Sequence, residues 1–428
     1  TSQVVWAETS VSTHHFLLIY TRSTLAEQTT PVALKFSDAF ASVSNVTMED
    51  FDLDFTDLGG VLTWSPALDD ETLVSDYVVY FGSAAMTRNG SFMCSQENET
   101  SDIVSTAPWC KSLYFGMVPV GTENLTVPAD THLADSHFLI YTRSILVEQT
   151  TPVAHLIADV GANVRNISFV GKDLDMHDLG GVLSWESPES MLRVTSYYVY
   201  LAEDALGAYG LRTQVQPTLV AGDNDIDLPP ETPRLNFTHF LVYTASILAE
   251  QTTPSSRAIQ DEASRAANVS FEDQDLDEFE IGGLLSWKDP VDFSEVTHYN
   301  VYLAESREGI NRSYLGNVTV GGNTFDVPVD TPLLSYTHLL IYAESTLVEQ
   351  TTPAAVRIIE TVASVSALTF VDLDLDLNEL GGYVTWQAAS SPLVLSYNIY
   401  LASDTMGGGR SMVAGGSADV GITRATLP

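Results

Sequence analysis

The sequence predicts an all-β protein made of tandem seven-stranded antiparallel β-sandwiches, and two observations carry that prediction. Landmark residues recur four times with the same spacings of 121, 102 and 99 residues, which gives a repeating unit of about a hundred residues. Within each unit, short β-branched and aromatic runs alternate with Gly, Pro and Asp, as antiparallel strands and their turns do. The landmarks are Trp64, Trp185, Trp287 and Trp386; Glu27, Glu148, Glu250 and Glu349; Gly59, Gly180, Gly282 and Gly381.

The expected strands are clearest in the third repeat. The first run leads into an Asp-Leu-Asp element, and the second ends on the recurring Trp. A Pro-containing turn then precedes a Tyr-x-Val-Tyr run, and the last run is followed by Glu-Gln-Thr-Thr-Pro. We expect strands within 268–271, 281–287, 299–303, 317–320, 324–327 and 337–342.

The landmarks also predict the domain organisation. Three whole sandwiches are expected, with the first carrying about twenty extra residues that hold both cysteines. The expected segments are 1–40 (last strands of a sandwich), 41–161 (sandwich 1 with the cysteine insertion), 162–263 (sandwich 2), 264–362 (sandwich 3) and 363–428 (an incomplete acceptor sandwich).

The two ends of the chain are circularly permuted with respect to the repeat. Residues 420–428 align with 320–328, so the chain is expected to stop after the fifth strand of a sandwich. Residues 4–6 align with 126–128, so the strand that contains Phe16, Leu18 and Tyr20 is a sixth strand without a preceding sandwich. We therefore expect residues 1–36 to act as donor strands and roughly 363–428 to act as the acceptor.

Uncovered ends would be costly. Four or five large apolar side chains left in water forfeit about 6–15 kcal/mol of burial, as much as the stability of a typical domain. Strand donation between copies would give a head-to-tail filament, and donation within one chain would give a ring. In the third possibility, the chain is a fragment of a longer monomeric adhesive or spacer array. The leading hypothesis is a structural protomer of an extracellular glycosylated filament, joined by donor-strand complementation.

The charge of the chain limits its partners. The formal net charge is −38, with 18 Lys and Arg against 56 Asp and Glu. Such a surface repels phosphate backbones and anionic lipids, so we expect no nucleic acid and no membrane as partners. No apolar run reaches the length of a membrane span, and the chain starts at Thr1, which suggests a trimmed product. Copies of the chain itself and N-linked glycans are the expected partners.

Two signals predict secretion. Nine of the fifteen asparagines lie in Asn-x-Ser/Thr, where chance would give about three. The only two cysteines, Cys94 and Cys110, lie in one insertion and are expected to form a local disulfide. The expected glycosylation sites are Asn45, Asn89, Asn98, Asn124, Asn166, Asn236, Asn268, Asn311 and Asn317.

The Asp-Leu-Asp elements are the candidates for a metal site. Two carboxylates at i and i+2 of a strand share a face and suit a hard cation such as calcium, although the same alternation is typical of a solvated strand face. No other cofactor is expected. The candidates are Asp52, Asp54, Asp173, Asp175, Asp275, Asp277, Asp374 and Asp376, followed by Asp57, Asp178, Glu280 and Glu379.

Catalysis is not expected. His137, His239 and His338 recur at one repeat position on an apolar strand, which favours packing or a corner hydrogen bond over a catalytic site. The sequence contains no nucleophile elbow, phosphate-binding glycine loop or His-Glu-x-x-His motif. A carbohydrate-active enzyme is the least favoured hypothesis, because the paired carboxylates occur in every repeat.

The repeat motifs resemble a known fold. The Trp of the second strand, the Tyr-x-Val-Tyr of the third and the sixth strand running into Thr-Thr-Pro resemble the fibronectin type III fold, which implies an immunoglobulin-like sandwich. His137, His239 and His338 replace the usual corner tyrosine of that family. The Asp-Leu-Asp and Glu-Gln-Thr-Thr-Pro elements resemble repeat arrays in large secreted proteins of dinoflagellate-type algae.

Overall fold

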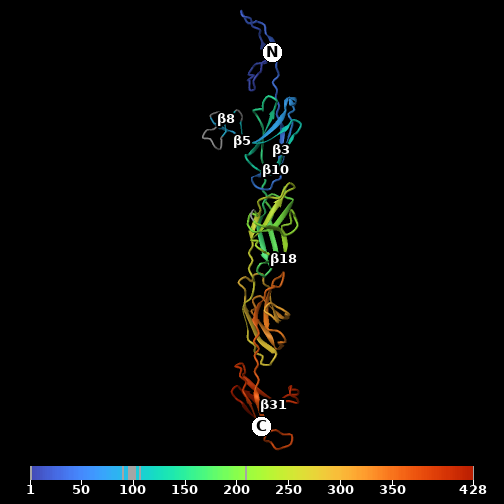
Figure 1. Cartoon of the computed structure of the whole chain (residues 1–428), viewed down its shortest axis with the longest axis vertical. Helices are drawn as coiled ribbons and strands as arrows, with labels where there is room; N and C mark the ends of the chain where they lie inside the picture. Colours follow the sequence, from blue (N-terminus) through green and yellow to red (C-terminus); the bar gives the residue numbers. More distant parts are fainter. Residues whose placement is uncertain (1, 89–90, 95–102, 106–107, 208–209, 428) are drawn as a thin grey trace. The chain divides into compact units, whose positions relative to one another are not determined.

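The computed structural model is built from antiparallel β-strands (Figure 1). It describes residues 2–88, 91–94, 103–105, 108–207 and 210–427, and within these residues the single helical element is a 3₁₀ turn at Glu71–Leu73. The chain divides into two compact units. One contains Thr1–Ile167, Trp185–Asn224 and Phe237–Ala258; the other contains Ser168–Ser184, Asp225–Asn236 and Ile259–Pro428. The predicted all-β fold of tandem antiparallel sandwiches is confirmed.

Repeat 1, residues 41–161, is a two-sheet sandwich within the first unit. Its core contains Trp64 from the middle strand of the smaller sheet, and Tyr77, Phe81, Phe138 and Ile140 from the two central strands of the larger sheet. The three-stranded sheet has the order β10(Asn124–His132)-β4(Asp57–Ser65)-β3(Ser44–Asp50). The four-stranded sheet has the order β12(Val153–Leu156)-β11(His137–Arg143)-β5(Asp76–Ala84)-β9(Trp109–Pro119).

The insertion of repeat 1 forms a small sheet of its own, which the sequence did not predict. Its order is β6(Met86–Arg88)-β7(Ser91–Cys94)-β8(Ile103–Ser105). The predicted disulfide is confirmed, since Cys94 is bonded to Cys110 at the start of β9. This bond ties the insertion to the four-stranded sheet.

Repeat 2, residues 162–263, has strands in both units, with the same strand order as repeat 1. One sheet has the order β13(Arg165–Gly171)-β14(Asp178–Glu186)-β18(Asp225–Pro233). The other has the order β16(Arg212–Gln214)-β15(Ser196–Ala202)-β19(His239–Ala245)-β20(Ser255–Ala258), with β17(Leu219–Val220) also paired to β15.

Repeat 3, residues 264–362, is a complete sandwich in the second unit. The rings of Trp287 and Tyr299 pack edge-to-face, with their centroids 5.5 Å apart. Both residues lie in a core with Leu285, Val301 and Ile341. Its sheets have the orders β21(Ala267–Phe271)-β22(Glu280–Lys288)-β25(Thr324–Pro332) and β24(Ser313–Thr319)-β23(His298–Ala304)-β26(His338–Glu344)-β27(Ala354–Arg357).

Two parts of the chain have fewer strands than these sandwiches. In the first unit, the one described partner of β1(Phe16–Ile19) is β2(Val32–Lys35), whereas the equivalent β11 pairs on both sides. In the second unit, the described part of repeat 4, residues 363–427, has the sheets β28(Ser366–Asp372)-β29(Gly382–Gln387)-β32(Arg424–Leu427) and β30(Ser396–Leu401)-β31(Ser411–Asp419). Among the residues that the structure describes, β30 pairs with β31 alone, whereas its equivalent β23 pairs with both β24 and β26.

Candidate assembly surfaces

The β1–β2 hairpin exposes apolar residues that are buried in the other repeats. Leu17 is 48% exposed and Ile19 is 70% exposed, whereas their equivalents in repeat 1, Phe138 and Ile140, are 0% and 1% exposed. Such a two-stranded ribbon has no core of its own. The hairpin therefore resembles the last two strands of a sandwich without the strands that would cover them.

The two faces of β1 have different equivalents, because successive side chains of a strand point to opposite sides. In repeat 3, the equivalents of Leu17 and Ile19 lie in the core between the sheets, whereas the equivalents of Leu18 and Tyr20 pack with Tyr302 on the outer side. The donor residues named from the sequence, Phe16, Leu18 and Tyr20, thus share one face. The sequence did not indicate Leu17 and Ile19 as the core-facing pair, because strand alternation alone does not show which face of a strand points into the core.

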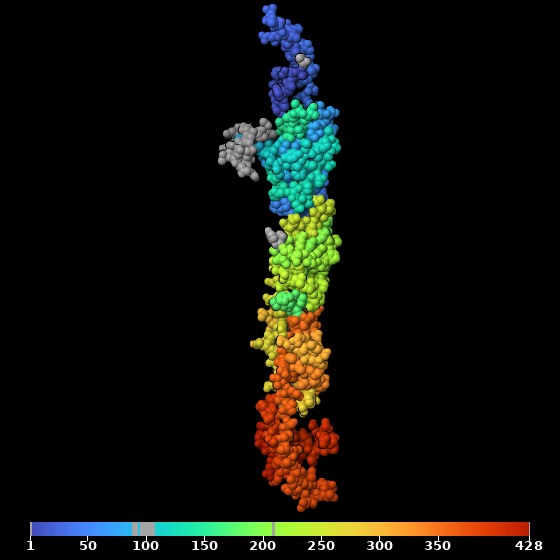
Figure 2. Space-filling model, in the orientation of Figure 1, coloured from blue at the N-terminus to red at the C-terminus, as the bar shows by residue number. Residues whose placement is uncertain are grey.

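Repeat 4 contains a matching groove. Its volume is about 850 Å³, and Trp386, Tyr397 and Ile399 are among the residues that line it. The lining residues belong to the red part of Figure 2, at the carboxy-terminal end of the colour bar. At its rim, Leu380 is 45% exposed although its equivalent Leu58 is 0% exposed. The groove lies beside the unpaired edge of β30, where the other repeats have their sixth strand.

Each complete repeat carries a cluster of two tyrosines, a glutamate and a cation on the outer face of its larger sheet. In repeat 3, Arg312 lies 4.5 Å from the Tyr302 ring and 4.3 Å from the Tyr342 ring. Glu349 accepts a hydrogen bond from the Tyr302 hydroxyl at 2.8 Å and pairs with Arg312 at 2.8 Å. Burial, reinforced by Glu349, raises the pKa of Tyr302 to about 12. The equivalent clusters are Lys111, Tyr80, Tyr141 and Glu148, and Arg212, Tyr200, Tyr243 and Glu250.

Repeat 4 has only half of this cluster. Arg410 lies 5.1 Å from the Tyr400 ring. Within the described part of repeat 4, no second tyrosine and no glutamate occupies the remaining positions. By repeat alignment, the missing pair corresponds to Tyr20 and Glu27 of the hairpin. This cluster was not found from the sequence, although the recurring Tyr and Glu were a usable signal.

The Asp-Leu-Asp elements lie in the loop after the first strand of each sandwich and not on a strand, so the predicted solvated strand face is wrong. In repeats 1 and 2 the second aspartate is also buried. Asp52 is 4% exposed and Asp54 is 1% exposed. The preceding Asp50 accepts backbone hydrogen bonds from Asp52, Gly59 and Val160. Burial nevertheless dominates at Asp50 and raises the pKa of its carboxyl from 3.8 to about 6. These carboxylates hold the loop together from inside.

The second aspartate of the element contacts the Thr-Thr corner of the following repeat. Within the first unit, Asp54 accepts backbone hydrogen bonds from Thr252 at 2.6 Å and Thr253 at 2.9 Å, and bonds from both hydroxyls. Within the second unit, Asp175 is bound in the same way by the backbone N–H groups of Thr351 and Thr352 and by the Thr352 hydroxyl. The recurring Glu-Gln-Thr-Thr-Pro is thus a receptor for the aspartate of a neighbouring repeat.

The leucine between the two aspartates enters the same junction. Leu174 is 2% exposed and belongs to the core of repeat 3. Its carbonyl accepts a hydrogen bond from Gln350 Nε2 at 2.9 Å, as the Leu53 carbonyl does from Gln251 at 2.7 Å. A Cβ at Gly180 would lie 3.0 Å from Leu347 of the corner, so the corner also packs closely against the glycine landmark.

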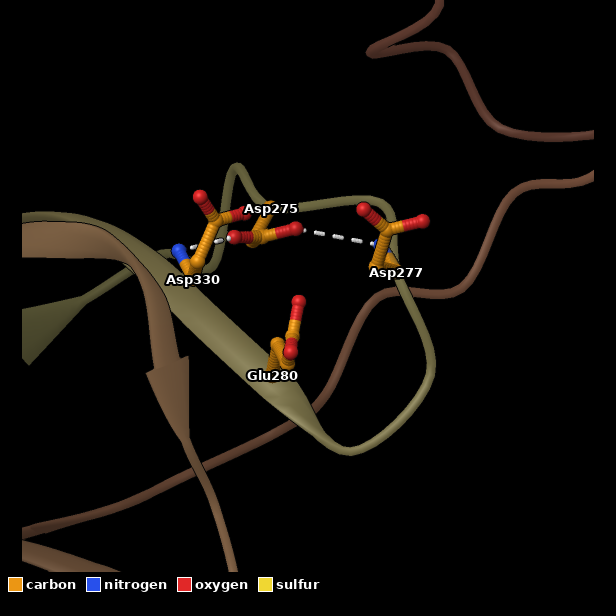
Figure 3. Close-up of side chains that lie close together, drawn as sticks. All are labelled: Asp275, Asp277, Glu280 and Asp330. Atoms are coloured by element: carbon orange, nitrogen blue, oxygen red, sulfur yellow. Dashed lines mark hydrogen bonds between the residues drawn. The ribbon is translucent and has the colours of Figure 1, made fainter. Parts of the chain in front are cut away.

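In repeats 3 and 4, no Thr-Thr corner among the described residues contacts the second aspartate of the element. Asp277 and Asp376 are exposed, and their carboxylates accept no hydrogen bond from any described residue. In Figure 3, Asp275 accepts hydrogen bonds from the backbone N–H groups of Asp277 and Asp330, at 3.1 and 2.8 Å. Leu375 is 97% exposed although its equivalents Leu53 and Leu174 are 2% exposed.

The candidate calcium ligands do come together. One oxygen from each of Asp275, Asp277, Glu280 and Asp330 lies within 4.8 Å of the others (Figure 3). Two of the expected partners, Asp57 and Asp178, are not in the clusters, and residues of β10, β18 and β25 that the sequence did not indicate take part. Calcium binding stays a prediction. The other clusters are Asp52, Asp54 and Asp130; Asp173, Asp175 and Glu231; Asp374, Asp376 and Glu379.

Seven of the nine expected glycosylation sites lie among the described residues, and all seven are exposed; Asn89 and Asn98 lie outside that part of the chain. Asn45, Asn166 and Asn268 share one repeat position with φ near +50°, where asparagine is tolerated better than most residues. The three recurrent histidines begin the sixth strands. His239 Nδ1 lies 2.8 Å from the Thr238 hydroxyl, and His137 and His338 contact the preceding Ser136 and Thr337.

Comparisons with known proteins add little. No family model and no curated protein matches the chain. Solved structures that match include the FN1–FN3 domains of chicken CNTN1, with 13% identity, 75% of this chain and 98% of that chain covered, and a TM-score of 0.21. The central fibronectin-III array of RIM-binding protein matches with 12% identity, 76% and 99% coverage and a TM-score of 0.19. No helix among the described residues is long and apolar enough to cross a membrane.

Proposed function

We propose that the chain is a structural protomer of an extracellular, N-glycosylated filament, in which the β1–β2 hairpin of one copy completes repeat 4 of the next. The observation that carries this proposal is the match between an uncovered hairpin and an open groove with an unpaired strand edge. A heterologous contact of this kind propagates from copy to copy. The role is structural rather than catalytic.

The proposal fixes a strand register. In repeat 3, Ile341 pairs with Val301 and Tyr342 pairs with Asn300. By equivalence, Ile19 would pair with Ile399 and Tyr20 with Asn398 of the other copy. Leu17 and Ile19 would then enter the groove beside Trp386, each gaining about 1.5–3 kcal/mol from burial.

The outer face supports the same register. Placed there, Tyr20 and Glu27 would complete the cluster that Arg410 and Tyr400 begin in repeat 4. The Thr29–Thr30 corner of the hairpin would also reach Asp277, as Thr252–Thr253 reach Asp54 in the first unit. Core, cluster and corner therefore favour a second copy of the chain as the occupant.

Deleting residues 1–36 should leave monomers in size-exclusion chromatography, while the full chain forms fibres visible by electron microscopy. Leu17→Asp with Ile19→Asp should do the same in the full-length chain, because two charges would enter the groove. Val4→Asp is the matched control, since Val4 is also exposed but lies outside the hairpin. Fibres formed by the deletion variant would refute the proposal.

A monomeric adhesive or spacer array is the second candidate, because neighbouring strands in a longer chain would cover the same surfaces. The intact mass of the native polypeptide separates the two. A mass beyond that of 428 residues plus glycans, on a particle that stays monomeric, would favour the array. A monomer of the expected mass with a protected β30 edge would indicate closure within one chain.

A further inference from the structure

We infer a second contact between copies: the loop at Asp374–Asp376 of repeat 4 docks on the Thr150–Thr151 corner of repeat 1 in the next copy. This inference rests on the proposed filament, in which repeat 4 of one copy precedes repeat 1 of the next. It concerns a different surface from the hairpin groove. The occupant is therefore again a second copy of this chain.

The loop of repeat 4 has the form of a junction without its neighbour. Leu375 is 97% exposed, whereas Leu53 and Leu174 at the same repeat position are 2% exposed. Asp376 is exposed and accepts no hydrogen bond from a described residue, whereas Asp54 accepts four from a corner. An exposed leucine beside a carboxylate without a hydrogen-bond donor from the described residues matches the loop that is buried where repeat 1 meets repeat 2 and where repeat 2 meets repeat 3.

Repeat 1 has the matching receptor. Its Gln149–Thr150–Thr151 corner is equivalent to Gln251–Thr252–Thr253 of repeat 2, which binds Asp54. No described carboxylate accepts a hydrogen bond from Thr150 or Thr151 in this way. A pocket of about 310 Å³ lies beside the corner, lined by Ala41, Val74 and Thr150 among others. A leucine side chain would fill part of this pocket, and the Thr150 and Thr151 N–H groups would bind the Asp376 carboxylate.

The glycine landmark supports the same arrangement. A Cβ at Gly59 would lie 2.5 Å from Leu248 of the docked corner, and one at Gly180 would lie 3.0 Å from Leu347. At Gly381 the three atoms nearest to a Cβ all belong to Asp374 of its own loop, the first at 3.3 Å, and none belongs to a corner leucine. By equivalence, the space in front of Gly381 would receive Leu146, which is 66% exposed.

Hydrogen exchange of full-length filaments tests the inference separately from the hairpin. Insertion of the hairpin protects the amides of β30, and docking of the loop protects the amides of Thr150 and Thr151. In Leu375→Ser with Asp376→Asn, we expect β30 to stay protected while the corner exchanges at least about tenfold faster, from loss of a charge-assisted contact. Gly381→Ala, which obstructs Leu146, should give the same pattern.

Met406→Ser is the control, because Met406 is 92% exposed on a turn of the same repeat and should leave both regions protected. Wild-type filaments with a protected β30 and a corner that exchanges as fast as in the residue 1–36 deletion would overturn the inference and leave the filament standing. A protected corner with an unprotected β30 would overturn hairpin donation and support the docking contact.

Discussion

At the scale of single residues, one repeat position shows a backbone requirement that can be measured. Asn45, Asn166 and Asn268 adopt left-handed φ values of 49–51°, and Ala367 occupies the same position with φ 49°. A left-handed conformation costs an ordinary L-residue roughly 1–2 kcal/mol, and asparagine is tolerated there. Asn268→Ala should therefore destabilise repeat 3 by about 1 kcal/mol, and Ala367→Asn should stabilise repeat 4 by a similar amount.

The measurement is calorimetric unfolding of protein made in a host that adds no N-glycans, because Ala367→Asn also creates an Asn-Leu-Thr acceptor. Asn317→Ala is the control, since Asn317 is an exposed acceptor with an ordinary φ. A neutral Asn268→Ala in this host would mean that glycosylation, and not backbone geometry, is the reason for asparagine at this position.

At the scale of elements, the outer cluster holds the third and sixth strands of a sandwich together. Glu349 accepts hydrogen bonds from Tyr302 and Asn300 and pairs with Arg312. Glu349→Gln should lower the local stability of β23 and β26 by about 2 kcal/mol, because charge-assisted bonds are lost in a half-buried place. Native-state hydrogen exchange of those strands measures the change.

The control is the Arg307–Glu308 pair, whose side chains are 69% and 68% exposed. Arg307→Gln should change exchange very little, because solvent screens such a surface pair. Equal effects of the two substitutions would show that the cluster contributes no more than an ordinary surface ion pair.

Elements formed by short stretches of the chain could be predicted from the sequence, whereas contacts between repeats could not. The repeat, its strands and the local disulfide follow from spacing and periodicity, which are properties of short stretches. The junction could not be predicted, because Asp54 and Thr253 are 199 residues apart and the Asp-Leu-Asp pattern is the same where it is buried and where it is exposed. Burial of that aspartate depends on which repeat follows it, and no local pattern contains that information.

At the scale of the whole molecule, the net charge of −38 should make the fold more stable in mild acid. Burial raises the pKa of Asp50 to about 6, and burial together with neighbouring carboxylates raises the pKa values of Asp130, Asp178 and Glu231. The folded chain therefore takes up protons at a higher pH than the unfolded chain. The resulting stability is fully present below the unfolded value near 3.8 and is lost as pH rises through the raised values.

We therefore expect the midpoint of thermal unfolding to be higher at pH 5 than at pH 7.5, measured by calorimetry at constant ionic strength. Asp292 and Glu305, whose pKa values are lowered by hydrogen bonds, act in the opposite direction, but they are outnumbered by the raised groups. Asp50→Asn should reduce the difference between the midpoints at the two pH values, because the carboxyl whose pKa is raised to about 6 no longer titrates. A midpoint that falls steadily from pH 7.5 to pH 5 would show that the buried carboxylates are held as anions by their backbone donors, so that the hydrogen bonds at the loops outweigh burial.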